Sequence, residues 1–204
     1  MNTLKASLLD PAKAVYDYSL PAGEPWLHAV KAGQTLRIID LEGNQAQGLF
    51  LMISAMALPN SGQVLIEGIP TTNLHPEKLR KRVASLSQHD QLIYGSVIDN
   101  IQMGRHFTTE QIIELAEAVG LATLVLSLTD SYQTVLNPEA STLDRKLKTL
   151  ILLCRALIDQ PAVLLWDVQM HYLPHAQLQH VLTYCDQHFK GTLLLASVQD
   201  HSLE

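Results

Sequence analysis

The residues with the clearest chemical implication lie in the loop 40–48, which joins a β-like run to an apolar segment. Such a loop can hold a phosphate when it offers glycine amides, a lysine and a hydroxyl, because these groups meet the phosphate oxygens and a magnesium ion together. Here the loop reads DLEGNQAQG, with Ala46 at the lysine position and Gln47 at the hydroxyl position. Both side chains that phosphate binding requires are therefore missing.

The other loop residues also oppose an anion. Asp40 and Gln45 stand where turn glycines are needed, and Asp40 and Glu42 bring two carboxylates close to the place of a triphosphate. Gly43 keeps its position, either as a turn glycine or as a residual phosphate contact. We expect the loop to repel a triphosphate, so that ATP with magnesium is a cofactor only if this altered loop still binds it.

Two further polar residues follow apolar runs. Asp167 ends AVLLWD, where a carboxylate could hold magnesium or serve as a hydrogen-bonded strand end, and Gln88 follows VASLS as a nucleotide contact or a polar loop residue. With Ala46 and Gln47 facing it, Asp167 is interpreted as a strand-end carboxylate. Together with Gly43, these two residues form the candidate cofactor-binding set, and no catalytic residue is predicted.

The histidines near the C-terminus do not predict a metal site. His171 and His175 are four residues apart, and His180 and His188 follow. Pro174 is expected to begin a helix, which leaves His171 outside it, and zinc requires three or four converging ligands. A solvated, histidine-rich helix face is the favoured interpretation.

The elements that must position these residues alternate between strand and helix. Short runs rich in leucine or β-branched residues predict strands at 35–40, 63–68, 83–87, 162–167 and 192–197. Helices are expected at 48–58, 108–120, 143–159 and 174–189, the second with a capping box from Thr108 to Gln111. Because the strands are apolar on both faces, the predicted fold is α/β with a mainly parallel sheet covered by helices on both faces.

Composition narrows the class of protein. A chain of 204 residues with 47% hydrophobic residues predicts one domain over 1–204. The net charge of −6 makes nucleic acid an unexpected partner, although basic residues cluster at 78–82. Apolar runs are too short to span a bilayer, so no direct membrane insertion is expected. Cys154 and Cys185 form no paired motif, Cys154 is expected to be buried, and a cytoplasmic location is the default.

From Gly33 to Ser197 the chain resembles the nucleotide-binding domain of ABC transporters of the exporter type, which implies a P-loop NTPase-like, ABC ATPase-like fold. Two stretches carry the resemblance, SGQVLIEGIPTTNLHPEKLRKRVASLSQHDQLIYGSVIDNIQMG at 61–104 and CRALIDQPAVLLWD at 154–167. Gln88 stands in the place of the family's Q-loop glutamine, and Asp167 ends the Walker B strand.

The resemblance also shows which functional residues are changed. LDRKL at 143–147 replaces the family's signature sequence, Val168 replaces the catalytic glutamate, and Val198 replaces the switch histidine. Phosphoryl transfer depends on all of these parts together, so ATPase activity is expected to be lost. The partners implied are a transmembrane transporter subunit or a second ABC ATPase domain, through which the chain would be associated with a membrane.

A second resemblance covers only the N-terminal part. LPAGEPWLHAVKAGQTLRIIDLEGNQA at 20–46 is similar to the opening segment of urea carboxylase-associated (urea amidolyase-associated) proteins, where it begins a β-rich domain. Residues 1–47 would then differ in origin from the rest. The alternatives left open are a small-molecule protein of that type and a recombined or designed chimera with no evolved activity.

Overall fold

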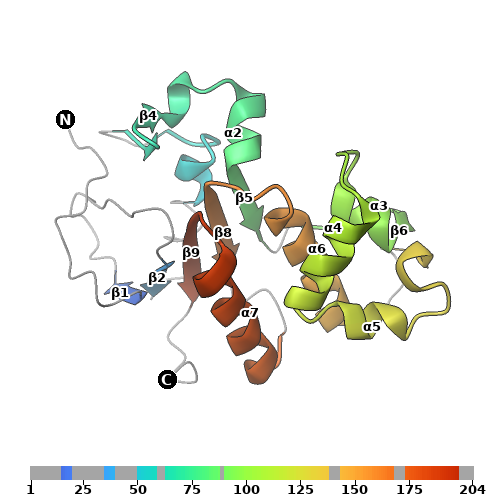
Figure 1. Cartoon of the computed structure of the whole chain (residues 1–204). Coiled ribbons are helices and arrows are strands. Elements are labelled where there is room, and N and C mark those ends of the chain that lie inside the picture. The colour runs from blue at the N-terminus through green and yellow to red at the C-terminus, as the bar shows by residue number, and fades with distance from the viewer. Residues whose placement is uncertain are drawn as a thin grey trace. The chain divides into compact units, whose positions relative to one another are not determined.

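The computed structural model describes residues 15–19, 35–39, 50–58, 63–87, 90–137, 143–167 and 173–197 (Figure 1). The chain divides into two compact units. The first comprises Met1–Ser85, Pro161–Gln169 and Lys190–Glu204, and the second Leu86–Gln160 and Met170–Phe189. The expected single domain over 1–204 stays a prediction.

The main sheet has the strand order β1-β2-β9-β8-β5. Its strands are β1 (Val15–Ser19), β2 (Thr35–Ile39), β9 (Thr192–Ser197), β8 (Val163–Asp167) and β5 (Val83–Leu86). The pairs β1–β2, β2–β9 and β8–β9 are parallel. The predicted strands at 35–40, 83–87, 162–167 and 192–197 are confirmed, whereas β1 was not predicted. Because β1 and β2 join this parallel sheet, the N-terminal segment contributes to an α/β fold.

The side chains of β8 are buried on both faces, as is usual for a strand inside a parallel sheet. Val163, Leu164, Leu165 and Trp166 are all buried along β8, so neither face of this strand is solvated. On one face, Leu165 belongs to a core cluster with Phe50 and other apolar residues of the first unit. This cluster fixes the helical turn that follows the loop 40–48 against the sheet.

The helix predicted over 48–58 is shorter than expected. Helical residues are described from 50 to 53, after which the N–H of Met56 donates to the carbonyl of Leu51 at 2.8 Å. Ala55 takes a φ of 53° between them, which is the left-handed position of a Schellman motif. The prediction of a helix over 48–58 was wrong at its C-terminal end, because this motif ends the helix and leaves Met56 77% exposed.

The predicted strand 63–68 is also shorter. β3 (Leu65–Ile66) and β4 (Ile69–Pro70) pair antiparallel around Glu67 and Gly68, whose φ values are 52° and 79°. Two adjacent positive φ values make a tight hairpin turn, so the chain reverses where a continuous strand was expected. The 3-10 helix η1 (Thr71–Asn73) and α2 (Pro76–Arg82) follow.

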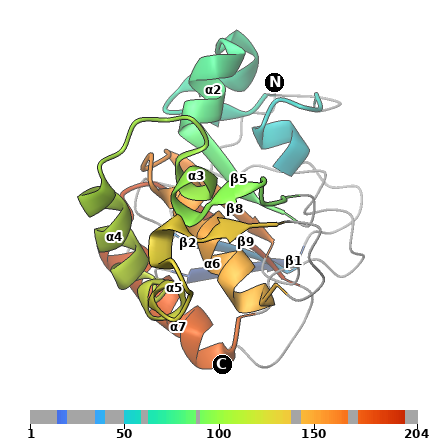
Figure 2. The same cartoon turned by 90° about the vertical axis from the view of Figure 1, so that its right-hand side faces the viewer.

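The second unit is mostly helical (Figure 2). Its elements are β6 (Gly95–Ser96), α3 (Val97–Gln102), α4 (Thr109–Ala118), α5 (Ala122–Leu126), η2 (Ser131–Gln133), β7 (Val135–Leu136), α6 (Arg145–Leu157) and α7 (His175–His188). The predicted capping box of α4 is confirmed, since Thr108 and Gln111 exchange both hydrogen bonds. Pro174 has a ψ of 147°, so it is the N-cap of α7 and the helix begins one residue later than predicted.

Helix α6 is amphipathic at its start and buried later. Leu150 and Leu153 are fully buried and Leu157 is 4% exposed, as the sequence predicts. Arg145 is exposed, and Lys146 is half-buried. Although α6 starts with basic residues, its apolar second half makes it the core helix of the second unit.

Candidate functional site

The candidate cofactor-binding residues are only partly described. Asp167 ends β8 and is half-buried, in register with Ala196 of β9. Gly43 and Gln88 lie outside the described residues, as do Val168 and Val198. The structure therefore places Asp167 at the carboxyl end of a parallel strand, which is where α/β folds gather ligand-binding groups.

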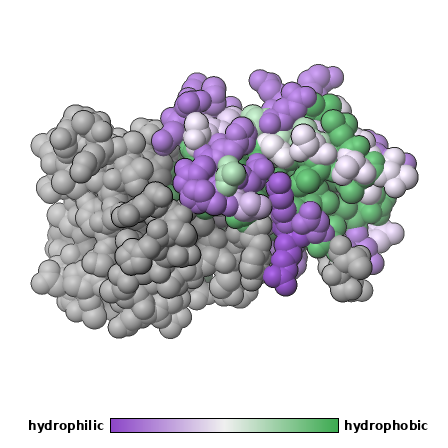
Figure 3. All heavy atoms as spheres, turned by 90° about the horizontal axis from the view of Figure 1, so that it is seen from below, coloured by the Kyte–Doolittle hydropathy of each residue, from purple (hydrophilic) through white to green (hydrophobic). Residues whose placement is uncertain are grey.

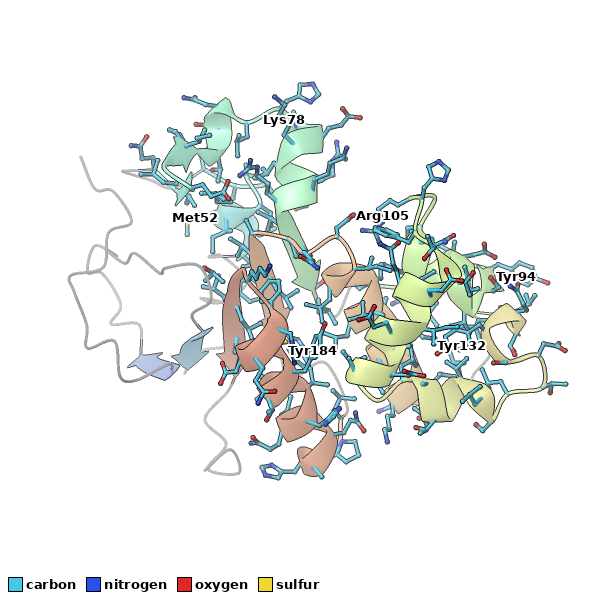
Figure 4. The ribbon with its side chains drawn as sticks, viewed as in Figure 1. Met52, Lys78, Tyr94, Arg105, Tyr132 and Tyr184 are labelled. Carbon is cyan, nitrogen blue, oxygen red and sulfur yellow. The ribbon has the colours of Figure 1, made fainter. Side chains whose placement is uncertain are left out.

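The best-defined arrangement of polar groups surrounds the segment 91–96 of the second unit. Leu92 is 4% exposed and anchors the segment, whereas Ile93 is 40% and Tyr94 74% exposed. Figure 4 shows the labelled Tyr94 side chain at the outer edge of this unit. Val135 of β7 lies beside the segment, opposite Ser96, and is 57% exposed.

The buried Asn100 side chain in α3 holds this segment from inside. Its Oδ1 accepts the N–H of Ile93 at 2.8 Å, and its Nδ2 donates to the carbonyl oxygens of Ile93 and Ser96, both at 3.0 Å. A longer contact of 3.4 Å reaches the carbonyl of Gly95. Asn100 is fully buried, and these bonds satisfy its amide.

Arg155 of α6 completes the network. Its Nε donates to the backbone carbonyl of Asn100 at 2.7 Å, its Nη2 to Asn100 Oδ1 at 3.0 Å, and its Nη1 to the carbonyl of Gln91 at 2.8 Å. Burial lowers the pKa of Arg155, while the Asp90 carboxylate acts in the opposite direction. The guanidinium remains charged at neutral pH, since an arginine is not deprotonated in proteins.

A second arginine joins the end of α3 to α6, which pack against each other (Figure 2). Arg105 donates from Nε to the carbonyl of Gln102 at 2.8 Å, and from Nη2 to the carbonyls of Ile101 and Arg155, both at 2.9 Å. Its guanidinium also forms an ion pair with Asp159. Two arginine side chains therefore bond the C-terminal half of α3 to α6.

A cavity of about 600 Å³ lies among α4, α7 and the end of α6 in the second unit. Tyr184 and His188 stack in it with ring centroids 5.2 Å apart, and His180 Nε2 lies 2.9 Å from the carbonyl of Ala118. Glu114 is a further lining residue, and the lining includes no lysine or arginine. Without a fixed cation, this cavity does not replace the altered loop as a site for a triphosphate.

Both cysteines are buried and free. Burial raises the pKa of the Cys154 thiol strongly and that of Cys185 to about 12. Neither thiol is a nucleophile near neutral pH, because the thiolate is the reactive form. In the described part of the chain, no cluster of metal-ligating side chains could hold an ion. No helix among the same residues is long and apolar enough to cross a membrane.

The comparisons with known proteins establish the family. The ABC transporter family matches residues 30–168, more than half of the chain, and the chain belongs to that family. Over 155 residues it is 27% identical to Alpha-hemolysin translocation ATP-binding protein HlyB of Escherichia coli, covering 76% of this chain and 22% of HlyB. Over 171 residues it is 29% identical to Beta-(1-->2)glucan export ATP-binding/permease protein NdvA of Bartonella quintana (strain Toulouse), covering 82% of this chain and 29% of NdvA.

A solved structure confirms the fold. The chain is similar to a bacterial Atm1-family ABC exporter with ATP bound, with a TM-score of 0.75, 20% identity, and coverage of 82% of this chain and 30% of that one. The predicted α/β fold with a mainly parallel sheet and helices is thus confirmed. The chain corresponds to the nucleotide-binding domain of ABC transporters with exporter-type relatives, and it spans less than a third of the length of each relative named here.

Sequence reasoning missed the network of Asn100 and Arg155. The available signal was the position of Arg155, a charged residue within the apolar run LILLCRAL. A charge in such a run is stable only when its donors find acceptors, so it indicates a buried hydrogen-bonded partner. Nothing in the sequence alone identified Asn100 as that partner.

Proposed function

We propose that this chain is a degenerate, non-hydrolysing nucleotide-binding domain that acts as the non-catalytic partner of a membrane transporter. The observation that carries the proposal is Ala46 at the position of the phosphate-binding lysine. A triphosphate at this loop would meet the carboxylates of Asp40 and Glu42 without the ammonium that offsets its charge. Nucleotide affinity is therefore lost together with hydrolysis.

The other eroded positions act in the same direction. Val168 cannot activate a water molecule, Val198 cannot contact a phosphate, and LDRKL lacks the glycines that allow close backbone approach. In this proposal, Asp167 is a strand-end carboxylate, and Gly43 and Gln88 are loop residues that no longer hold a nucleotide. Residues 1–204 form one domain of the ABC ATPase type, and the family match from residue 30 includes the altered loop.

The partner surface is the docking patch, which consists of Ile93, Tyr94 and Val135. These apolar side chains are 40–74% exposed and cluster around β6 and β7 of the second unit. An exposed apolar cluster of this kind suits an apolar helical segment of a transmembrane subunit. Docking there would hold the domain at the cytoplasmic side of a membrane, while a second ABC ATPase domain would supply hydrolysis.

Exposed apolar surface is not confined to the docking patch. Leu126 of α5 is 67% exposed, and on the face seen in Figure 3 a hydrophobic area, in green, borders hydrophilic side chains. The docking patch is favoured because a hydrogen-bonded network fixes its backbone, whereas Leu126 lies in the last turn of a short helix. The same chain therefore offers Leu126→Ser as a control for Tyr94→Ser in assays of partner binding.

Restoring the phosphate-binding side chains tests the proposal. The triple variant Gln45→Gly, Ala46→Lys and Gln47→Ser should regain measurable affinity for magnesium-ATP, because the rest of the family fold is present. The matched variant with Ala46→Met in place of Ala46→Lys adds length without charge and should regain none. Equal affinity in the two variants, or in the unsubstituted chain, would contradict the assignment of the loss to the missing lysine.

A further inference from the structure

The segment that carries Ile93 and Tyr94 is held by hydrogen bonds to a side chain of α3. Residues 91–94 belong to no helix or strand, and the backbone N–H and carbonyl of Ile93 both bond to the one side chain of Asn100. That side chain also accepts from Arg155. The conformation of this loop is therefore set by a buried amide and a guanidinium instead of a backbone ladder.

Helix α6 holds the loop from a second direction. Arg155 donates to the carbonyl of Gln91, and Lys148 Nζ donates to Gln91 Oε1 at 2.7 Å. Lys148 and Arg155 are seven residues apart, which is two helical turns, so they lie on the same face of α6. Gln91 is thus bonded to one face of α6 through both its backbone and its side chain.

The exposed side chains of this loop gain little from being ordered. Leu92 is buried, but Ile93 is 40% and Tyr94 74% exposed, so holding these two side chains costs conformational entropy that their burial offsets only in part. The same ordering is useful when a partner binds, because a preorganised loop loses less entropy on association. We infer that Asn100 and Arg155 are positioning residues that hold the docking patch in its binding-ready conformation, an inference that rests on the proposed function.

The network also connects docking to the core helix. Arg105 bonds the last turn of α3 to the carbonyl of Arg155. The side chain of Arg155 bonds the loop 91–94 to α6 through the carbonyl of Gln91. The loop, α3 and α6 consequently form one hydrogen-bonded body within the second unit. A transmembrane helix seated on Tyr94 acts on α6 through this body.

Amide hydrogen exchange tests the positioning role without a partner. In Asn100→Ala, the exchange rate of the Ile93 amide should rise at least about tenfold relative to that of Leu121, whose N–H donates to Ala116 at 2.7 Å. Asn100→Asp keeps the acceptor of the Ile93 N–H but loses the donors to the carbonyls of Ile93, Gly95 and Ser96, so exchange should rise in the same direction and by less. Val181→Ala, an equally buried truncation in α7, should leave this ratio unchanged. An unchanged ratio in both Asn100 variants overturns the inference.

Photo-crosslinking separates this inference from the proposed function. With p-benzoylphenylalanine at position 94, the full chain in host membranes should crosslink to a helical segment of a polytopic membrane protein, and Asn100→Ala should lower the yield at least about threefold. Val181→Ala should not lower it. A crosslink of unchanged yield in Asn100→Ala overturns the positioning role alone. Absence of that crosslink in the otherwise unsubstituted chain, or a crosslink to a second copy, overturns the proposed docking and with it this inference.

Discussion

Replacing Arg155 with methionine removes a partly buried charge while keeping an unbranched side chain. Two of its hydrogen bonds, from Nε and Nη2 to Asn100, are partly buried, and the third, to the carbonyl of Gln91, is exposed. A bond to a charged group contributes about 1.5–3 kcal/mol when water cannot replace it, so the two partly buried bonds together predict a loss of about 3–6 kcal/mol. Water can replace the bond to Gln91, which adds little.

Urea unfolding, followed by the fluorescence of the buried Trp166, measures this loss as a change in the free energy of unfolding. Arg155→Lys keeps the charge and part of the bonding, so it should lose about half as much. Arg145→Ala on the same helix is the control, because Arg145 is exposed and an ordinary surface change stays within about 0.5 kcal/mol. A loss of less than about 1 kcal/mol in Arg155→Met, or one equal to the control, would refute the assignment of these bonds.

Three further predictions concern other parts of the structure. The hydrogen bonds from Ser96 lower the pKa of Asp99, so the stability that this carboxylate provides should be present above its ordinary pKa of 3.8 and lost as the pH falls below it. In urea unfolding, Asp99→Asn should lack this pH dependence and should lower the free energy of unfolding by about 0.3–1.5 kcal/mol near neutral pH. The thiol of Cys185 ionises first in the unfolded chain, so its contribution to stability should fall by about 1.4 kcal/mol per pH unit as the pH rises from 9.0 toward 12, in addition to the fall that the buried Cys154 causes, and an aromatic disulfide reagent at pH 8 should modify the protein only after unfolding. Ala55→Gly relieves the left-handed φ of 53° and should raise the free energy of unfolding by about 0.5–1 kcal/mol and with it the melting temperature, whereas a lower melting temperature would show that the Schellman motif is misassigned.

The sequence predicted the elements whose patterns are local and strongly apolar. The runs that became β8 and β9 are apolar on both faces, and α4 carries its capping residues, so their positions followed directly. The helix described from Phe50 ends earlier than predicted, at a left-handed Ala55. This end could not be predicted, because alanine rarely takes a left-handed conformation and no glycine stands at that position. The hairpin at Glu67 and Gly68 was missed for a related reason, since a single glycine within an apolar run does not identify a turn.

The sequence predicted which phosphate-binding side chains are missing, but it did not predict the hydrogen bonds that hold the docking patch. The missing lysine at Ala46 can be seen in the sequence because the phosphate-binding loop is a contiguous motif. The bonds between Asn100 and Arg155 join residues that are 55 positions apart, and only the packing of α3 against α6 brings them together. Long-range polar pairs of this kind leave no local pattern from which they could be predicted.

Isothermal titration of the unsubstituted chain with magnesium-ATP tests the central claim most directly. The helical turn described at 50–53 after the loop contributes at most about 0.3–1 kcal/mol through its dipole, which cannot replace a lysine, a magnesium ion and glycine amides. With Ala46, Gln47 and Glu42 in the loop, the dissociation constant should be millimolar or higher. This corresponds to a binding free energy on the order of −4 kcal/mol or a less negative value. A dissociation constant in the low micromolar range that Asp167→Ala abolishes would contradict the account.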